Sequence, residues 1–464
     1  MARRWLASLL AIGFLALPLA GLALSGEPKA EFDEFVRTLR EDRRLDRIGY
    51  VVEVKLPLSK ANETKIFAYA GKYFYASPDG YLTHVNHARL DRMQKAKLDV
   101  RIIDKKRLDD AREAWYLVWV GNEAEDRVLR DRFEPLFAHS HTRLIRIRPE
   151  DEDYLQFHGL RYSLVEEELL PLKTPPMTFK SPRIDLDPKI AELLPLITKE
   201  DMAATVKRLE DCVSRQVRAK GNAEAVEWLA AQFQQMPGLE VSTPTFSYST
   251  KPLSNVVAIQ KGVKDPSIVF VVIGHLDSTV GWSSSGGQAP GADDNGSGAA
   301  GVLHIASVAS TLALPYTVIY CCANAEEVGL VGSKALARQL AAASGQTVKA
   351  VLNLDMIADR DDNQVAVIGN TRSNWLIDVF KDVARLYTGL ESKCLYNSDI
   401  WYSDHSSFWN IGVPAILTIE GYPEMSPHYH KVTDTVANLS PALMERVARA
   451  NLATLLTLNA EPRR

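Results

Sequence analysis

The sequence predicts an α/β fold for residues 189–464, with a small α+β domain before it. After residue 189, short apolar runs alternate with segments whose apolar residues recur at helical spacing. Several of these runs lack polar alternation, which is typical of strands buried on both faces of a sheet. We therefore predict a central mixed, largely parallel sheet flanked by helices. The charge-rich residues 30–171 are expected to form the separate α+β domain.

The composition excludes some classes of protein. The chain has 464 residues, of which 46% are hydrophobic, and this is enough for two globular domains. Its formal net charge of -4 provides no basic field for a phosphate backbone, so a nucleic-acid partner is disfavoured. Four cysteines are too few for a disulfide-built scaffold, and the sequence does not pair them. Cys321 and Cys322 lie in an apolar run and are expected in the core.

Residues 1–25 have the features of an export signal. Arg3 and Arg4 precede an apolar stretch, and the small residues Ala23 and Ser25 suit cleavage by a signal peptidase. We expect the mature protein to be secreted or periplasmic, with no stable membrane insertion after cleavage. The alternative is an uncleaved membrane anchor, because the apolar stretch approaches the length that spans a bilayer.

The α+β domain is predicted from alternating strand-like and helix-like segments. The strand-like segments are 49–56, 65–71, 114–121 and 142–149, and the helix-like segments are 87–99 and 125–139. Residues 89–104 and 153–168 share a helix-then-strand pattern, which is a weak indication of an internal repeat. His139 and His141 are interpreted as surface residues rather than metal ligands, because no carboxylate or cysteine cluster accompanies them. Four prolines in residues 172–188 mark a linker.

The elements of the larger domain follow from its apolar segments. The predicted strands are 255–262, 267–277, 316–327, 349–358 and 414–421, and the predicted helices are 210–236, 296–311, 330–344 and 374–388. In such sheets, sites form where strands end and loops begin. The polar residues of interest fall at those ends.

Imidazoles and carboxylates follow successive predicted strands. His275 and Asp277 end one strand, Glu326 and Glu327 end the next, and Asp355 ends a third. The loop "ADDNGSG" and a late loop with "HYHK" add Asp293, Asp294 and His430. Adjacent glutamates at the mouth of a fold raise each other's pKa unless a cation lies near. Histidine and carboxylate ligands of this kind are found in two-metal hydrolases, where one glutamate binds metal and the other acts as a base.

Six segments carry a resemblance to a known family. They are "GHLDSTVG", "APGADDNGSGAAG", "NAEEVGLVGS", "NLDM", "YSDHSSFW" and "YHKVTDT", in the order of that family. On them, residues 190–464 resemble the bacterial leucyl aminopeptidase type of co-catalytic dizinc metallopeptidase. The same superfamily holds aminopeptidase Y, glutamate carboxypeptidases and glutaminyl cyclases. The resemblance implies a zinc-exopeptidase-like sheet and two zinc ions per chain.

The resemblance also implies a role for each site residue. The metal ligands would be His275, Asp294 as the bridging carboxylate, Glu327, Asp355 and His430, with Glu327 and His430 completing one metal and Asp355 the other. Glu326 would be the general base, and Asp277 would orient the imidazole of His275. The family pattern favours His430 over His428 as ligand, and it treats His405 as a structural residue. It further implies a cis peptide bond between Asp294 and Asn295.

These residues predict an exported aminopeptidase that releases an N-terminal residue, preferentially a large apolar one such as leucine, from peptides with a free N-terminus. Apolar side chains near the ligands are candidates for the substrate pocket, although ordinary packing explains each of them equally well: Met356, Trp401, Tyr402, Met425 and Tyr429. Carboxylates near the metals suit a substrate ammonium. The nearest cations in the motifs, among them Lys334 and Lys431, form no paired clamp for a terminal carboxylate.

Three alternatives remain open at this point. The first is a glutaminyl-cyclase-like acyltransferase, the second is a carboxypeptidase of the same superfamily, and the third is a catalytically silent binding module. The complete ligand pattern argues against the first and the third. For residues 30–171 we hypothesise a propeptide-like or access-controlling domain, because they lie between the predicted signal and the predicted catalytic domain.

Overall fold

A computed structural model describes most of the chain after residue 47. The described residues are 48–56, 62, 75–77, 80–107, 112–148, 151, 154–155, 158, 160–165, 184–248, 251–280, 287–359, 362–398, 400–422 and 426–460. The predicted export signal, the predicted strand 65–71 and most of the predicted linker lie outside them. Within the described part of the chain, no helix is both long and apolar enough to cross a membrane.

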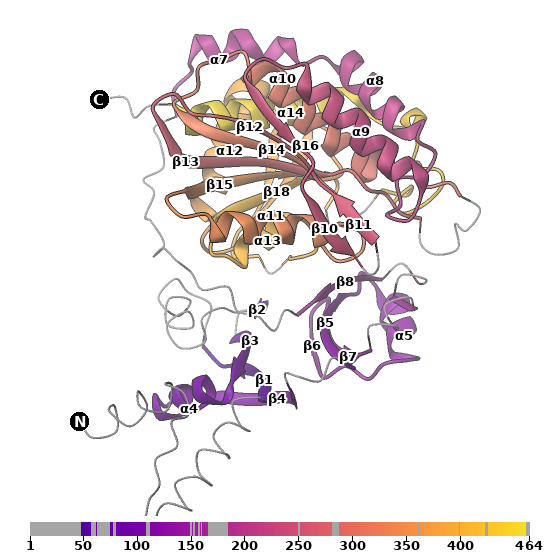
Figure 1. Ribbon diagram of the computed structural model, residues 1–464, viewed down its shortest axis with the longest axis vertical. Coiled ribbons are helices and arrows are strands. Elements are labelled where there is room, and N and C mark those ends of the chain that lie inside the picture. Colours follow the sequence, from indigo (N-terminus) through magenta and orange to yellow (C-terminus); the bar gives the residue numbers. More distant parts are fainter. Residues whose placement is uncertain are drawn as a thin grey trace, which may run out of the picture.

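An eight-stranded mixed sheet forms the centre of the larger part of the molecule (Figure 1). Its order is β17-β16-β18-β15-β13-β14-β12-β9. The strands are β9 (Leu239–Ser242), β12 (Val256–Gln260), β13 (Asp265–His275), β14 (Tyr316–Ala323), β15 (Thr347–Leu354), β16 (Gln364–Gly369), β17 (Glu391–Leu395) and β18 (Ala415–Ile419). The central pairs β14-β13, β13-β15 and β15-β18 are parallel, and antiparallel pairs lie toward both edges. The predicted fold class is thereby confirmed.

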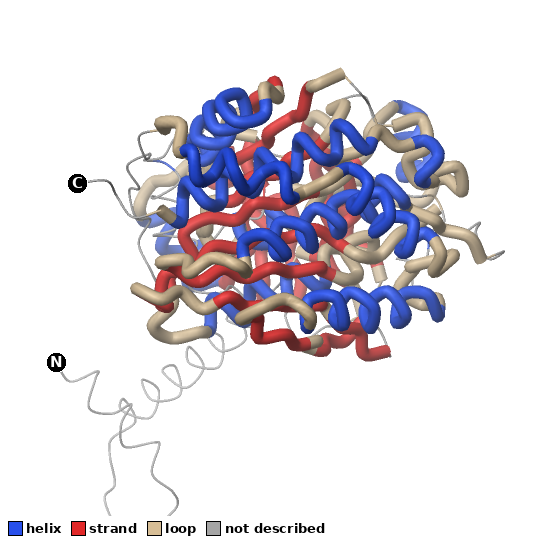
Figure 2. The backbone as a smooth tube through the Cα atoms, turned by 90° about the horizontal axis from the view of Figure 1, so that it is seen from above, coloured by secondary structure: helices blue, strands red, loops and turns tan. Residues whose placement is uncertain are grey.

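Helices bury both faces of this sheet, as Figure 2 shows from above. Phe270 and Val272 of β13 pack on one side, and Val269, Val271 and Ile273 pack on the other. The first face is covered by α8 (Lys199–Glu210), α9 (Lys220–Gln234), α10 (Gly298–Ala309), α12 (Asn374–Thr388) and α14 (Pro441–Asn459), and the second by α11 (Val331–Ala342) and α13 (His405–Trp409). Because apolar side chains alternate between two buried faces, β13 appears in the sequence as an unbroken apolar run.

Every predicted strand and helix of this part overlaps an observed one, but helices α8, α13 and α14 were not predicted. Strands β9, β16 and β17 were not predicted. The predicted helix 210–236 is wrong at its start, because α8 ends at Glu210 and α9 begins only at Lys220. Between them Val213 adopts a left-handed backbone conformation with φ of 67°, which interrupts any helix. Cys321 and Cys322 are buried as predicted, and all four cysteines are free.

The described N-terminal residues form two four-stranded antiparallel sheets with equivalent strand orders, β2-β3-β1-β4 and β6-β7-β5-β8. The first contains β1 (Ile48–Val54), β2 (Tyr75–Ser77), β3 (Gly80–Asn86) and β4 (Val100–Arg107), with α4 (His87–Lys95). The second contains β5 (Ala114–Trp119), β6 (Phe137–His139), β7 (Thr142–Ile147) and β8 (Arg161–Leu164), with α5 (Glu123–Arg130). The equivalent orders confirm the internal repeat. The predicted helix 125–139 is wrong beyond Arg130, since residues 137–139 pair with β7 as β6.

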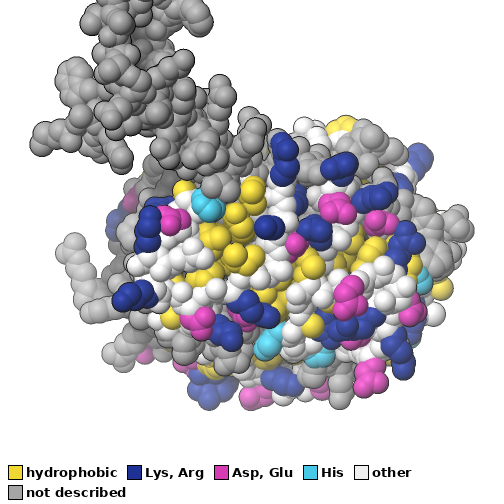
Figure 3. Space-filling model, turned by 90° about the horizontal axis from the view of Figure 1, so that it is seen from below, with side chains coloured by type: hydrophobic (Ala, Val, Ile, Leu, Met, Phe, Trp, Pro, Cys, Tyr) yellow, Lys and Arg dark blue, Asp and Glu magenta, His cyan; other side chains and the backbone are white. Residues whose placement is uncertain are grey.

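The two N-terminal sheets lie below the larger sheet in Figure 1. A buried apolar cluster joins both N-terminal sheets to the C-terminal part through Trp401; its members are Val51, Leu82, Trp115, Leu117, Leu144, Val165 and Trp401. Figure 3 shows the molecule from this side, with basic and acidic side chains intermixed around small apolar groups.

Candidate active site

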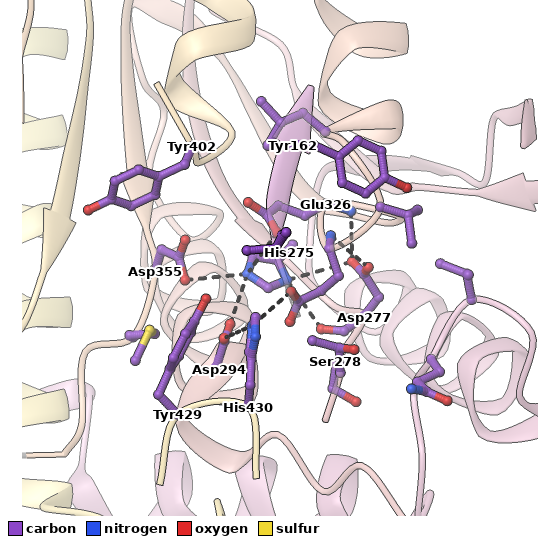
Figure 4. A pocket seen from close by; sticks show the side chains of 18 of the residues that line it. Tyr162, His275, Asp277, Ser278, Asp294, Glu326, Asp355, Tyr402, Tyr429 and His430 are labelled. Atoms are coloured by element: carbon purple, nitrogen blue, oxygen red, sulfur yellow. Dashed lines mark hydrogen bonds and ion pairs between the residues drawn. The ribbon is translucent and has the colours of Figure 1, made fainter. Parts of the chain in front are cut away.

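A pocket lies where β13, β14 and β15 end (Figure 4). His275 is the last residue of β13, Glu326 and Glu327 follow β14, and Asp355 immediately follows β15. Because the three strands are parallel neighbours, their carboxyl ends deliver these side chains to one edge of the sheet. Two further ligand candidates, Asp294 and His430, reach the pocket from loops.

Asp294 lies between the two imidazoles. Its Oδ1 is 3.3 Å from Nε2 of His275, and its Oδ2 is 3.2 Å from Nε2 of His430. On the His275 side, Oδ1 of Asp355 is also 3.3 Å from Nε2, and on the His430 side, Oε2 of Glu327 is 3.1 Å from Nε2. Each oxygen of the Asp294 carboxylate thus faces one imidazole and one further carboxylate. This is the arrangement of a carboxylate that bridges two ions.

The contacts around His430 fit a metal better than they fit hydrogen bonds. Although Nε2 of His430 is close to two carboxylate oxygens, it is buried and has no hydrogen-bond partner, and Oε1 of Glu327 has none either. Two groups of three side chains each place their ligand atoms within 4.8 Å of one another. One group is His275, Asp294 and Glu327, and the other is His275, Glu326 and Asp355. These buried imidazole and carboxylate atoms form a donor set suited to zinc.

The electrostatics of the cluster also call for a cation. Burial raises the pKa of Glu326 well above its usual value, and it raises the pKa of Glu327 to about 7, with the charge of Asp294 adding to the effect. Burial alone would lower the pKa of His430, but Glu327 and Asp294 raise it to about 9. Without metal, protons would therefore neutralise part of this acidic pocket. A bound cation would take their place.

Two carboxylates outside the ligand set hold the backbone of the ligand loops. Asp277 accepts from the backbone N–H groups of Glu326 and Glu327, at 3.1 and 3.2 Å. Asp434 does the same for Asp293 and Asp294, at 2.8 and 3.0 Å. The sequence predicted that Asp277 orients the imidazole of His275. Nδ1 of His275 lies 3.2 Å from the backbone carbonyl oxygen of Asp277 and 3.6 Å from its carboxylate. Asp434 was not predicted.

A buried arginine supports the loop before Asp294. Arg215 is 0% exposed, and its guanidinium donates to the carbonyls of Leu276, Pro290 and Gly291 at 2.6 to 2.7 Å. These bonds connect the end of β13 to the turn that leads into the bridging aspartate. Sequence reasoning missed Arg215, because the residue lies about 60 positions before the motifs and its partners are carbonyl groups of the main chain.

Three non-glycine residues at or beside the ligands adopt a left-handed backbone conformation. Ala325, Met356 and His430 have positive φ of 59°, 52° and 54°, although none is a glycine. The peptide bond between Asp294 and Asn295 is cis, as predicted. The hydroxyl group of Ser403 fixes another ligand candidate, because it donates to Oδ2 of Asp355 at 2.6 Å.

The other candidate histidines take structural positions. His405 is fully buried, and its Nε2 bonds to the carbonyl of Ile400 at 2.8 Å. His428 turns away from the pocket to Thr433, with Nδ1 3.0 Å from its hydroxyl oxygen. The geometry thus agrees with the preference for His430.

Four of the predicted substrate-pocket residues, Met356, Trp401, Tyr402 and Tyr429, line the pocket, and Met425 lies outside the described residues. Sequence reasoning missed several others, and three of them bear on substrate binding. Leu160 and Tyr162 come from the second N-terminal sheet, and Arg218 comes from the segment before α9. No local pattern marked them, because they are distant from the motifs in sequence.

Fold and site together are typical of a metal-dependent hydrolase. Residues 255–455 match the family model described as peptidase family M28. Over 270 residues the chain is 27% identical to a probable leucine aminopeptidase of Arthroderma otae, covering 54% of this chain and 70% of that one. It is also 27% identical to a probable zinc metalloprotease of Pyricularia oryzae, covering 52% of this chain and 60% of the relative.

Residues 255–455 thus form a peptidase family M28 domain, and with the similarity to leucine aminopeptidases this indicates a hydrolase of the metallo-aminopeptidase type. The LapA aminopeptidase of Legionella pneumophila has a similar fold, with a TM-score of 0.62 and 19% identity. This similarity covers 76% of the present chain and 99% of LapA. It therefore extends beyond residues 189–464 into the N-terminal part.

Proposed function

We propose that this protein is an exported aminopeptidase that uses two zinc ions to release the N-terminal residue of peptides, with a preference for a large apolar residue such as leucine. The observation that carries the proposal is the position of Asp294 between His275 and His430, beside a buried glutamate, Glu326, that is left over from the ligand set. Export rests on the sequence features of residues 1–25.

The residues divide into two metal sites and a base. His275, Asp294 and Asp355 would hold one ion, and His430, Asp294 and Glu327 would hold the other. When bound, the ions supply Lewis acidity that polarises the scissile carbonyl and lowers the pKa of a bound water. Glu326 accepts a proton from the attacking water and donates it to the leaving amine.

The surroundings favour a substrate with a free amine. Carboxylates of Glu327 and Asp355 lie at the cluster and attract an ammonium group. Met356, Tyr402 and Tyr429 line the adjoining part of the pocket and offer apolar surface to the first side chain.

The position of Arg218 in the pocket is the one observation that favours a carboxypeptidase as the alternative function. This cation lines the pocket, and arginine is well suited to bind a terminal carboxylate. It is one exposed side chain rather than a buried pair of donors, and acidic groups predominate near the metals. We therefore favour recognition of the amine.

One peptide in three forms tests the direction of cleavage: free at both ends, N-acetylated, and C-amidated. The proposal expects the N-acetylated form to resist cleavage and the C-amidated form to be cleaved. Rapid cleavage of the acetylated peptide, or loss of cleavage only on amidation, would contradict it.

Metal content separates the remaining alternatives. Elemental analysis of the purified protein should find about two zinc ions per chain for the proposed enzyme, one for a cyclase-like enzyme and none for a silent binding module. A chelator should abolish release of the N-terminal residue, and added zinc should restore it.

A further inference from the structure

The second N-terminal sheet supplies part of the pocket wall. Leu160 directly precedes β8 and Tyr162 lies within it, and both line the pocket that contains Glu326. They are 3% and 6% exposed. The carbonyl of Tyr162 lies over the loop after the glutamate pair, where a Cβ added to Gly329 would be 3.4 Å from it. The wall is therefore in close contact with the catalytic loop.

The same sheet holds a pocket segment from the C-terminal part. The ring of Trp119, at the end of β5, lies 5.1 Å from the ring of Tyr402 between centroids. Nε1 of Trp401 donates to the hydroxyl of Thr142 at 3.4 Å, and the indole packs in the cluster that joins the two N-terminal sheets. Trp401 and Tyr402 thus depend on N-terminal residues for their packing.

The pocket has two sides with respect to His275. Figure 4 shows Asp355, Tyr402 and Tyr429 on one side and Tyr162, with Asp277, on the other. If the first side chain of a peptide lies against Tyr402 and Tyr429, the chain beyond the scissile bond passes along the opposite side. Leu160 and Val328 also line the pocket and, like the ring of Tyr162, offer apolar surface to a bound peptide.

We propose, building on the aminopeptidase function proposed above, that Tyr162, assisted by Leu160, is a specificity-determining residue. It contacts the second residue of the peptide and favours an apolar side chain there. The N-terminal domain is then a permanent part of the working pocket, and its removal is not needed for activity.

The test compares two substrates that differ only after the scissile bond, Leu-Phe-amide and Leu-Gly-amide, with the zinc-loaded full chain. Tyr162→Ala should lower kcat/KM for Leu-Phe-amide by about tenfold, the size expected for a lost apolar contact, and should change Leu-Gly-amide by less than about twofold. Tyr162→Phe keeps the ring and should retain the wild-type ratio. Tyr154→Ala is the matched control, because Tyr154 packs against Phe133 in the same domain and does not line the pocket.

The outcomes separate the two proposals. If the wild-type protein cleaves neither peptide, the aminopeptidase function is overturned and this inference with it. If the wild type cleaves both, and Tyr162→Ala changes the two peptides equally or not at all, only the inference is overturned. Should Tyr162→Ala fail to fold, as judged by circular dichroism and gel filtration, Val328→Ala alters the same wall from the catalytic side. The same shift in ratio is expected for it, and an unchanged ratio would overturn the inference.

Discussion

At the scale of single residues, the site depends on carboxylates in three different roles. Asp294 faces both imidazoles, Glu326 and Glu327 share one loop, and Asp277 and Asp434 accept backbone N–H groups of the ligand loops. Like charges of this density are stable only when cations or donors compensate them. The roles can be separated by substitutions that remove a charge and preserve the shape.

Substituting the two adjacent glutamates separately should give opposite results. Glu326→Gln cannot accept a proton, so turnover should fall by about two or more orders of magnitude while zinc content stays nearly unchanged. Glu327→Gln should lose zinc, because an amide is a poorer ligand than a carboxylate. Turnover assays and elemental analysis on the same samples check both expectations. Equal zinc content in the two variants would show that the assignment of roles is wrong.

Asp434→Asn should weaken metal binding although Asp434 is not expected to touch the metal. The amide keeps one acceptor oxygen but places a donor against the N–H of Asp293 or Asp294, so the bridging loop loses one hydrogen bond. Loss of such outer-shell support typically lowers metal affinity by about tenfold or more. Competition with a zinc chelator measures it. Asp382→Asn, on the surface of α12, is the control, and an affinity equal to that of the control would refute the role of Asp434.

At the scale of elements, short loops after parallel strands carry most of the site, and the short helix α13 supports it from below. His405 begins α13 with its ring edge against Trp409, 4.4 Å between centroids. Burial lowers the pKa of His405 to about 4, so the ring is neutral in the folded protein. This neutral, buried histidine makes the stability of the fold sensitive to acid.

The sign of that dependence follows from the pKa. An unfolded chain takes up a proton on His405 below about pH 6.5, whereas the folded chain does so only near pH 4. The contribution of His405 is therefore complete above pH 6.5 and falls by about 3 kcal/mol as the pH falls to 4. Urea unfolding of the metal-free protein between pH 7 and pH 4 measures it. His405→Gln should show a flatter profile, and an unchanged slope in this variant would contradict the argument.

Sequence alone predicted the elements whose signals are local. The unbroken apolar run of β13 and the adjacent carboxylates after β14 lie within short windows, so both the fold class and the ligand candidates were accessible. Arg215 and Asp434 were not, because their partners are main-chain groups brought close only by folding. The edge strand β17 and its neighbour β16 were missed for a similar reason, since their pairing depends on neighbours rather than on pattern.

At the scale of the whole molecule, the N-terminal repeats and the catalytic part share one pocket. Apolar contacts between them include Trp119 with Tyr402 and the cluster around Trp401. The hypothesis of an access-controlling domain can therefore be made more specific. If the N-terminal part is a removable inhibitor, its separation should raise turnover, whereas separation of a permanent pocket wall should not. The catalytic part by itself would expose Trp401 and Tyr402 to water.

Cutting the linker while both parts are present distinguishes the two cases. We introduce a specific protease site between residues 176 and 182, cleave the folded zinc-loaded protein, and follow mass, association and turnover of a leucine peptide. The two parts should remain together on gel filtration at moderate salt, because the contacts that join them are mainly apolar and therefore little affected by ionic screening. Turnover should stay within about twofold of the uncut protein.

The uncut variant with the inserted site, treated with inactivated protease, is the control. Dissociation of the N-terminal part with a rise in turnover would identify it instead as an inhibitory propeptide, since the wall formed by Leu160 and Tyr162 would then block substrate rather than bind it.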